Sequence, residues 1–349
     1  MKRVRVSAPG KIVILGEYAV LEGAPAVVMA VDRRARVSLE QQAGSRCSIE
    51  APGWSRGPVE FRLDPSGRVL FDHRADRLSL VTHVLGEFFE MHGGAAACPP
   101  FHLVLDSRTL MEQRPAGPVK LGLGSSAALT VALCQALSYY VASQQDPVQP
   151  GLADLVRIHA GLQGGRGSGL DVAAGLHGGL IEYRCQPAPR ATAFVLPEAL
   201  EYCFVWSGDR ADTGTFLATV DAWRGRAAAE YGSIMAGLAE AAELGVRAGR
   251  GRDGGTFLRA LDDYVSLLQE LGKACKVDIL SPPHQRLREL ARQAGVVYKP
   301  CGAGGGDIGL GIATDPEALA GFRSAALAAN FQLLSLEGDD LGVHTQSED

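Results

Sequence analysis

The sequence predicts an α+β protein with two domains of moderate size. Its 349 residues are too many for one ordinary domain. A composition of 46% hydrophobic and 21% charged residues is typical of a globular protein with a sizeable core. Strand-like and helix-like patterns are mixed in both halves without strict β-α-β alternation. We expect an N-terminal domain over residues 1–190 and a C-terminal domain over residues 191–349.

The first half should combine strands with a few helices. Short β-type runs separated by glycine, proline or charged residues predict strands at 4–6, 12–15, 27–31 and 36–39. Apolar residues at helical spacing predict an amphipathic helix over 80–91. The other expected elements are a strand over 101–106, helices over 125–140 and 152–162, and a strand over 180–183.

The second half should be mostly helical. Residues 185–193 contain two prolines and little apolar bulk, so we interpret them as the linker between the domains. A strand is expected next, over 202–206. Further helices are predicted at 214–247, 255–273, 284–294 and 316–330, and further strands at 296–298, 308–312 and 332–336.

Charge and cysteine content exclude several functions. A formal net charge of -5 disfavours a nucleic-acid partner, which normally needs a basic face. The seven cysteines, odd in number and without metal-ligand spacing, indicate reduced thiols. The sequence has no apolar run of membrane-spanning length, and its basic N-terminus lacks the apolar stretch of a signal peptide. We expect a cytoplasmic monomer or homodimer that binds neither nucleic acid nor membrane.

A glycine-bearing loop, Lys120-Leu-Gly-Leu-Gly-Ser-Ser-Ala-Ala128, precedes an apolar helix. Gly122 and Gly124 permit a tight turn, and Ser125 or Ser126 can cap the helix. Free N–H groups and the positive end of the helix dipole would then stabilise a polyphosphate, and a serine hydroxyl there can bind Mg²⁺. The loop is not a Walker A sequence. An ordinary capped helix is the alternative interpretation.

Two further glycine clusters follow. In Gly164-Gly-Arg-Gly-Ser-Gly-Leu-Asp171, the backbone can approach a ligand closely while Asp171 points at it. Alternatively, the segment is a flexible loop in which Asp171 caps the next helix and Arg166 is solvated. In the segment 299–309, four glycines stand among the five residues 302–306. Ordering so many glycines on folding costs conformational entropy, and a bound ligand would explain why they are present. We therefore expect that tight turn to lie against a phosphate or nucleoside.

Lys11 follows a rigid Pro-Gly turn in the segment Ala8-Pro-Gly-Lys-Ile-Val-Ile-Leu-Gly-Glu-Tyr-Ala-Val-Leu21. Its side chain should therefore leave the surface at a fixed angle. A lone lysine is usually a solvated charge, so a functional interpretation depends on its neighbours in the fold.

Together these segments resemble the GHMP kinases, the family of galacto-, homoserine, mevalonate and phosphomevalonate kinases. Three family motifs match in order: Pro9-Gly-Lys-Ile-Val-Ile-Leu-Gly-Glu-Tyr18, Gly122-Leu-Gly-Ser-Ser-Ala-Ala128 and Gly302-Ala-Gly-Gly-Gly-Asp307. The resemblance implies a two-domain GHMP kinase fold, with an N-terminal domain like ribosomal protein S5 domain 2 and a ferredoxin-like C-terminal domain. It also implies an active site in the cleft between them, with ATP as co-substrate and Mg²⁺ as cofactor.

Within the family, the chain looks most similar to the phosphomevalonate kinases. The marks of that branch are the run 163–174, Glu17-Tyr18, Trp206-Ser-Gly208 and Asp307. The implied acceptor is phosphomevalonate. Mevalonate kinase, a mevalonate diphosphate decarboxylase and a non-catalytic sensor are the alternatives. The glutamate that helps to bind Mg²⁺ in mevalonate kinases has no counterpart here, and His159 and Gln163 occupy its neighbourhood.

The resemblance also implies a role for each site residue. Lys11 would bridge the donor and acceptor groups, Asp171 would orient Lys11 and the nucleophile, and Ser126 (or Ser125) would bind Mg²⁺. The expected nucleotide contacts are Gly122, Leu123, Gly124, Ser125, Ser126, Ala127, Gly304 and Gly305. The expected acceptor contacts are Glu17, Tyr18, Arg166, Ser168, Gly169, Arg210, Gly302 and Ala303.

Overall fold

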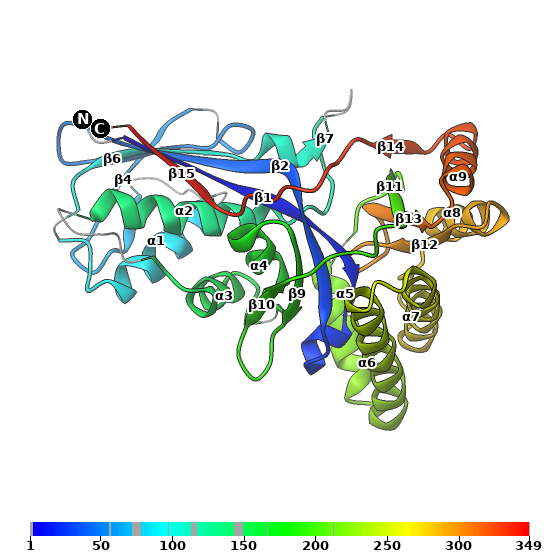
Figure 1. The fold of residues 1–349 in the computed structure, drawn as a ribbon. Helices are drawn as coiled ribbons and strands as arrows, with labels where there is room; N and C mark the ends of the chain where they lie inside the picture. Colours follow the sequence, from blue (N-terminus) through cyan, green and yellow to red (C-terminus); the bar gives the residue numbers. More distant parts are fainter. Residues whose placement is uncertain are drawn as a thin grey trace.

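The computed structural model describes residues 3–55, 57–71, 78–96, 98–112, 117–142, 149–165, 167–211 and 213–348. Strands and helices occur in both halves, which confirms the α+β class (Figure 1). The first half is built on a large sheet and the second half on a smaller one.

Two long antiparallel strands form the centre of the first half: β1 (Arg3–Leu15) and β2 (Ala26–Gln41). The prediction of four short strands here was wrong, because each expected pair belongs to one strand. The register of β1 against β2 shifts between Pro9 and Gly10 and again between Val13 and Leu15. The Pro-Gly pair therefore forms an irregularity within β1 rather than a separate turn, and Lys11 lies immediately after it.

Seven more strands complete this nine-stranded sheet. They are β3 (Cys47–Glu50), β4 (Val59–Leu63), β5 (Val69–Phe71), β6 (Phe101–Asp106), β9 (Leu180–Arg184), β10 (Arg190–Ala193) and β15 (His344–Glu348). The main order is β10-β9-β2-β6-β3-β4-β5, while β1 pairs with both β2 and β15. Only the β3–β6 pair is parallel among the described pairs of this sheet. The sequence did not predict β15, which returns the C-terminus to the N-terminus (Figure 1).

Helices lie along the large sheet (Figure 1). They are α1 (Ser79–Met91), α2 (Ser125–Val141), α3 (Leu152–Gly161) and α4 (Leu170–His177). Helix α2 contacts β1, β2 and the three other helices, and most of its residues are buried. A helix that is apolar all round belongs in a core. Shorter elements nearby are η1 (Ala19–Glu22), η3 (Arg108–Leu110), and the hairpin of β7 (Met111–Glu112) and β8 (Val119–Lys120).

The predicted linker over 185–193 is instead part of a β-hairpin. Strand β10 pairs antiparallel with β9, from Arg190 opposite Arg184 to Ala193 opposite Ile181. The boundary that we expected between residues 190 and 191 therefore falls inside β10. The two prolines occupy the turn, a position that requires no N–H donor in the sheet.

The second half carries a four-stranded antiparallel sheet in the order β12-β13-β11-β14. Its strands are β11 (Glu201–Trp206), β12 (Val297–Pro300), β13 (Ile308–Ala313) and β14 (Gln332–Leu334). Its helices are α5 (Thr213–Arg224), α6 (Ala228–Arg250), α7 (Gly254–Cys275), α8 (Pro282–Gln293) and α9 (Pro316–Ala328). The single helix predicted over 214–247 is two helices, which separate at Gly225, a weak helix former.

The two halves share one hydrophobic core, which extends from Val4 in β1 to Leu336. Helix α6 packs on η1, so the helical hairpin of α6 and α7 touches the first half directly. In the ranges that the structure describes, no helix combines the length and apolar character that a membrane span requires.

Candidate active site

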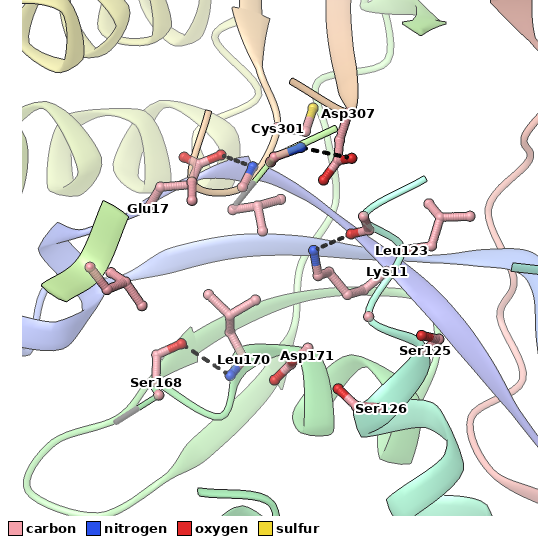
Figure 2. A pocket seen from close by; sticks show the side chains of 18 of the residues that line it. Lys11, Glu17, Leu123, Ser125, Ser126, Ser168, Leu170, Asp171, Cys301 and Asp307 are labelled. Atoms are coloured by element: carbon pink, nitrogen blue, oxygen red, sulfur yellow. Dashed lines mark hydrogen bonds between the residues drawn. The ribbon is translucent and has the colours of Figure 1, made fainter. Parts of the chain in front are cut away.

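A pocket of about 340 Å³ is lined by residues from both halves (Figure 2). Lys11, the first turn of α2 and the segment leading to Asp171 come from the first half. Arg210, Asp307 and the segment from Cys301 to Ala303 come from the second. The structure thus brings the three predicted glycine clusters and Lys11 to one place. Arg166 lies outside the described residues.

Helix α2 begins at the pocket because of two glycines. Gly122 and Gly124 have φ angles of 72° and 74°, a left-handed conformation that glycine adopts readily. The predicted serine cap was wrong: Gly124 is the N-cap, no side chain caps the helix, and Ser125 and Ser126 lie in its first turn. Their hydroxyls line the pocket. The first N–H groups of a helix lack intrahelical partners, so this end suits an anion.

Lys11 is held against the same loop. Its backbone N–H donates to the Leu123 carbonyl at 2.9 Å, and its Nζ donates to the Gly122 carbonyl at 2.9 Å. A Cβ at Gly124 would lie 3.2 Å from Cγ of Lys11. The lysine is therefore not a freely solvated side chain, and its ammonium lies beside the N-terminus of α2.

Asp171 lies in the first turn of α4, across the pocket from the second half (Figure 2). It is not the N-cap, because Gly169 has that position with a φ of 79°. One carboxylate oxygen accepts the Val172 N–H at 3.0 Å. A Cβ at Gly124 would lie only 3.4 Å from Cβ of Asp171, so the loop before α2 also approaches the aspartate closely.

His159 is a site neighbour to which sequence reasoning gave no role. It lies on α3 and is buried. Its Nε2 is 3.0 Å from the Ser126 hydroxyl oxygen, and its Nδ1 is 3.9 Å from an Asp171 carboxylate oxygen. His159 lies eleven positions before α4 and gave no distinct signal in the sequence, since its contact with α2 arises only from the packing of the helices.

The third glycine loop, residues 302–306, has two parts that lie in different surroundings. Gly302 and Ala303 line the pocket as expected, but Gly304 and Gly305 are not among its lining residues. A Cβ at Gly304 would lie 2.3 Å from the Ile279 carbonyl oxygen, and one at Gly305 would lie 2.5 Å from the Phe216 ring. These two glycines therefore allow protein segments to pack closely, which explains them without a ligand.

Glu17 and Tyr18, two of the expected acceptor contacts, form hydrogen bonds with residues of the second half. The buried Glu17 carboxylate pairs with the Lys299 ammonium and accepts the Gly302 N–H at 3.1 Å. The Tyr18 hydroxyl donates to the Ala303 carbonyl at 2.6 Å, and burial raises the pKa of this phenol. The two side chains hold the third loop, although both still border the pocket.

Two other predicted contacts lie outside the pocket lining. Ala127 is fully buried in α2. Gly169 packs on its own half, where a Cβ would lie 2.6 Å from a Val156 methyl group and 2.9 Å from the Tyr183 hydroxyl. Ser168, beside it, does line the pocket.

Asp307 lies in the pocket lining together with three cations. Desolvation raises the pKa of the Asp307 carboxyl, while the Ala211 N–H and the charges of Lys11, Arg210 and Lys120 act in the opposite direction. The Ala211 N–H donates to Asp307 at 3.3 Å. A Cβ at Gly122 would lie 2.4 Å from the other carboxylate oxygen, so Asp307 also packs on the loop before α2. All four charged side chains line the pocket.

Cys301 also borders the pocket. Desolvation raises the pKa of its thiol to about 11, so the thiolate is disfavoured at neutral pH. This agrees with a small hydrophobic role for Cys301 rather than a reactive one.

The residues present fit a Mg²⁺ ion that arrives with a nucleotide. The described residues contain no group of three or more His, Cys, Asp or Glu side chains that could hold a metal alone. Mg²⁺ usually takes one or two protein ligands and completes its shell with water and substrate phosphates. The Ser126 hydroxyl and the Asp171 carboxylate are oxygen donors on the same pocket wall.

Comparison with known proteins agrees with this fold. The GHMP kinases N terminal domain matches residues 79–179. The chain is 26% identical to a phosphomevalonate kinase of Streptomyces sp. strain CL190 over 87% of this chain and 88% of the relative. It is 34% identical to a mevalonate kinase of Methanothermobacter thermautotrophicus, over 50% of this chain and 48% of the relative.

A solved structure shares the whole fold. Streptococcus pneumoniae phosphomevalonate kinase, in complex with phosphomevalonate and AMPPNP, matches with a TM-score of 0.74 and 18% identity, over 96% of this chain and 99% of that one. The sequence match indicates the class of the ATP-dependent phosphotransferases, to which the GHMP kinases belong. Within this class, the chain carries a GHMP kinase N-terminal domain over residues 79–179.

Proposed function

We propose that this protein is a phosphomevalonate kinase, which transfers the γ-phosphoryl group of ATP to 5-phosphomevalonate in the mevalonate pathway of isoprenoid synthesis. The product would be 5-diphosphomevalonate. One observation carries the proposal: Lys11, Lys120 and Arg210 border the same pocket as the N-terminus of α2. A reaction between two phosphate groups needs cations more than it needs a base. The match to the Streptomyces phosphomevalonate kinase along most of both chains supports the same acceptor.

Phosphoryl transfer depends mainly on positioning and on charge stabilisation. The N-terminus of α2, with Gly122 to Ser126, would hold the ATP phosphates. Mg²⁺, held by Ser126 and Asp171 together with the phosphates, would neutralise part of their charge. Lys11 would stabilise the oxygens between the donor and acceptor groups, a position consistent with its contact to the Gly122 carbonyl.

The chemistry of the acceptor determines the role of Asp171. A phosphate monoester has a second pKa of about 6, so a phosphate oxygen of 5-phosphomevalonate is already ionised at neutral pH. That oxygen would attack the γ-phosphorus, the bond between the γ-phosphorus and the bridging oxygen would break, and ADP would leave. No proton has to be removed, so Asp171 would orient Lys11 and the acceptor rather than act as a general base.

Mevalonate kinase is the second candidate, favoured by the 34% identity to an archaeal mevalonate kinase over half of the chain. Its acceptor is an alcohol, which benefits from a general base such as Asp171. ADP release with Mg²⁺, ATP and either acceptor separates the two functions. Turnover on 5-phosphomevalonate alone is expected, and turnover on mevalonate alone would overturn the proposed acceptor. ATP hydrolysis or no turnover with either acceptor would contradict both.

The variant Asp171→Asn tests the proposed mechanism. On 5-phosphomevalonate we expect kcat to fall by about tenfold, because the carboxylate orients groups but abstracts no proton; general-base catalysis alone is worth about 100-fold to 10,000-fold. Steady-state ADP release at saturating ATP measures the change. A loss near a thousandfold or more would contradict the orienting role.

A further inference from the structure

His159 joins the two polar residues that the proposed function places at the metal. Its side chain is 3% exposed and lies between the Ser126 hydroxyl of α2 and the Asp171 carboxylate of α4. Nε2 is within hydrogen-bond distance of Ser126, at 3.0 Å, and Nδ1 faces Asp171 at 3.9 Å. Three helices thus meet at one imidazole, immediately behind the pocket wall.

The position of Asp171 selects one tautomer of this imidazole. A proton on Nδ1 faces the carboxylate favourably, whereas a lone pair on Nδ1 would face its negative charge. In the neutral imidazole with its proton on Nδ1, Nε2 carries the lone pair and accepts the hydrogen bond from the Ser126 O–H. The serine proton is then directed away from the pocket.

We propose that His159 is a positioning residue, which holds the Ser126 hydroxyl proton so that the serine oxygen offers its lone pairs to the Mg²⁺ of a bound nucleotide. This inference rests on the proposed kinase function. A hydroxyl group can rotate, and a proton that pointed into the pocket would repel a cation. Side chains that fix the orientation of a metal ligand commonly strengthen metal binding about 10-fold to 100-fold.

Substitutions at His159 can separate its two contacts. In His159→Gln, the side-chain carbonyl reaches the position of Nε2 and can still accept the Ser126 proton. In His159→Asn, the amide lies nearer the position of Nδ1, so the contact with Asp171 is kept and the acceptor for Ser126 is lost. His159→Ala removes both contacts.

The first measurement is the dissociation constant of a non-hydrolysable ATP analogue, obtained by calorimetry with Mg²⁺ and with EDTA. Mg²⁺ should tighten binding to the wild type, and His159→Ala and His159→Asn should reduce this tightening about tenfold, while affinity in EDTA changes less than about twofold. His159→Gln should restore the tightening to within about threefold of wild type. The second measurement is the ¹⁵N chemical shifts of His159, which should show the proton on Nδ1.

His83→Ala is the matched control. His83 lies on α1, and its Nε2 is 2.8 Å from the Ile158 carbonyl oxygen of α3, so this variant disturbs the helix of His159 without touching Ser126 or Asp171. It should bind the analogue as the wild type does. A loss equal to that of His159→Ala would show that helix packing causes the effect and would overturn the proposal.

The remaining outcomes separate this inference from the proposed function. Full Mg²⁺ tightening in His159→Ala, equal losses with and without Mg²⁺, or a proton on Nε2 would overturn the role of His159, even if 5-phosphomevalonate is the acceptor. No tightening in the wild type would overturn it too. Tightening that depends on His159 in a protein with no turnover on 5-phosphomevalonate would support His159 and refute the acceptor.

Discussion

At the scale of single residues, the structure distinguishes charges that face the pocket from charges that face each other. Lys11 borders the pocket and contacts the loop before α2, whereas Glu17, only six positions later, pairs with the buried Lys299. Both residues belong to one motif, and their spacing in sequence does not distinguish them. Lys11 lies within β1, whereas Glu17 lies beyond the end of that strand at Leu15, in the turn before η1, so the two side chains leave the chain in different backbone settings.

Lys11→Met tests the proposed role of the ammonium. We expect kcat to fall by about 100-fold or more, because removal of one transition-state donor in a water-poor site typically costs about 100-fold to 1,000-fold. Nucleotide affinity should change much less, since the N–H groups of α2 remain. Lys273→Met, an exposed lysine on α7, is the control for loss of a positive charge. Near-normal turnover of Lys11→Met would remove Lys11 from the mechanism.

His284 should make the stability of the protein depend on pH. Its Nε2–H donates to the Gly306 carbonyl at 2.9 Å, its Nδ1 accepts from the Tyr298 hydroxyl at 2.8 Å, and burial lowers its pKa from 6.5 to about 4. As the pH falls below 6.5, the unfolded chain binds a proton that the native His284 does not, so stability decreases until about pH 4.

Urea unfolding at pH 7 and pH 4.5 measures this effect in the wild type and in His284→Gln. The wild type should lose about 2 to 3 kcal/mol more on acidification than the variant, since each pKa unit corresponds to about 1.4 kcal/mol. Equal losses in the two proteins would show that His284 titrates alike in the folded and unfolded chains. Other groups that titrate in this range cancel in the comparison.

At the scale of elements, the three glycine-rich segments differ in the reason for their glycines. Gly122 and Gly124 turn the chain into α2, and their left-handed conformation opens the helix end to the pocket. In the third loop, Gly304 and Gly305 allow close packing on Ile279 and Phe216. A glycine cluster in a sequence thus predicts close approach, but it does not identify the group that approaches.

Gly302 and Gly304 provide a matched test within the third loop. Both have left-handed φ angles, 85° and 80°, but a Cβ at Gly302 would meet nothing within 4 Å, while one at Gly304 would lie 2.3 Å from the Ile279 carbonyl oxygen. Gly302→Ala should cost about 1 to 2 kcal/mol for the backbone conformation alone.

Gly304→Ala should cost about 1 to 3 kcal/mol more than Gly302→Ala, because its Cβ would clash with backbone and overpacking commonly costs about this much. Urea unfolding at neutral pH gives both values. Equal losses in the two variants would indicate that the Ile279 segment moves aside without cost, and the packing explanation for Gly304 would then be incorrect.

At the scale of the whole molecule, a buried ion pair joins the two halves at the pocket. Lys299 on β12 is fully buried; its ammonium pairs with Glu17 and donates to the carbonyls of Val13 at 3.3 Å and Pro300 at 2.7 Å. The Tyr264 hydroxyl of α7 donates to the Glu17 backbone carbonyl. These contacts place the third glycine loop against the first half.

Lys299→Met should destabilise the protein by about 3 to 5 kcal/mol, because it leaves the Glu17 carboxylate buried without its cation. Adding Glu17→Gln should recover part of this loss, since a neutral amide oxygen can still accept the Gly302 N–H. Unfolding by urea of the two single variants and the double variant completes the cycle. Additive losses would contradict a direct interaction of the two side chains.

The α+β class, most helices and the segments that meet at the pocket follow from the local pattern of the amino-acid sequence. This information is local: apolar spacing selects a helix, and glycines permit the left-handed turns at Gly122 and Gly124. The family resemblance rested on the same local motifs. The local pattern did not predict the length of β1 and β2 or the pairing of β15 with β1, because strand pairing depends on partners that are distant in the chain.

The contacts of each polar residue near the pocket depend on how distant segments pack together. Glu17 and Lys299 are 282 positions apart, and Ser126 and His159 are 33 apart on different helices. The local sequence pattern does not show which distant residues will meet, because the burial of a charge or an imidazole depends on which segments pack over it. The physical reason is that a buried polar group must find a partner, and the fold determines which partner is within reach.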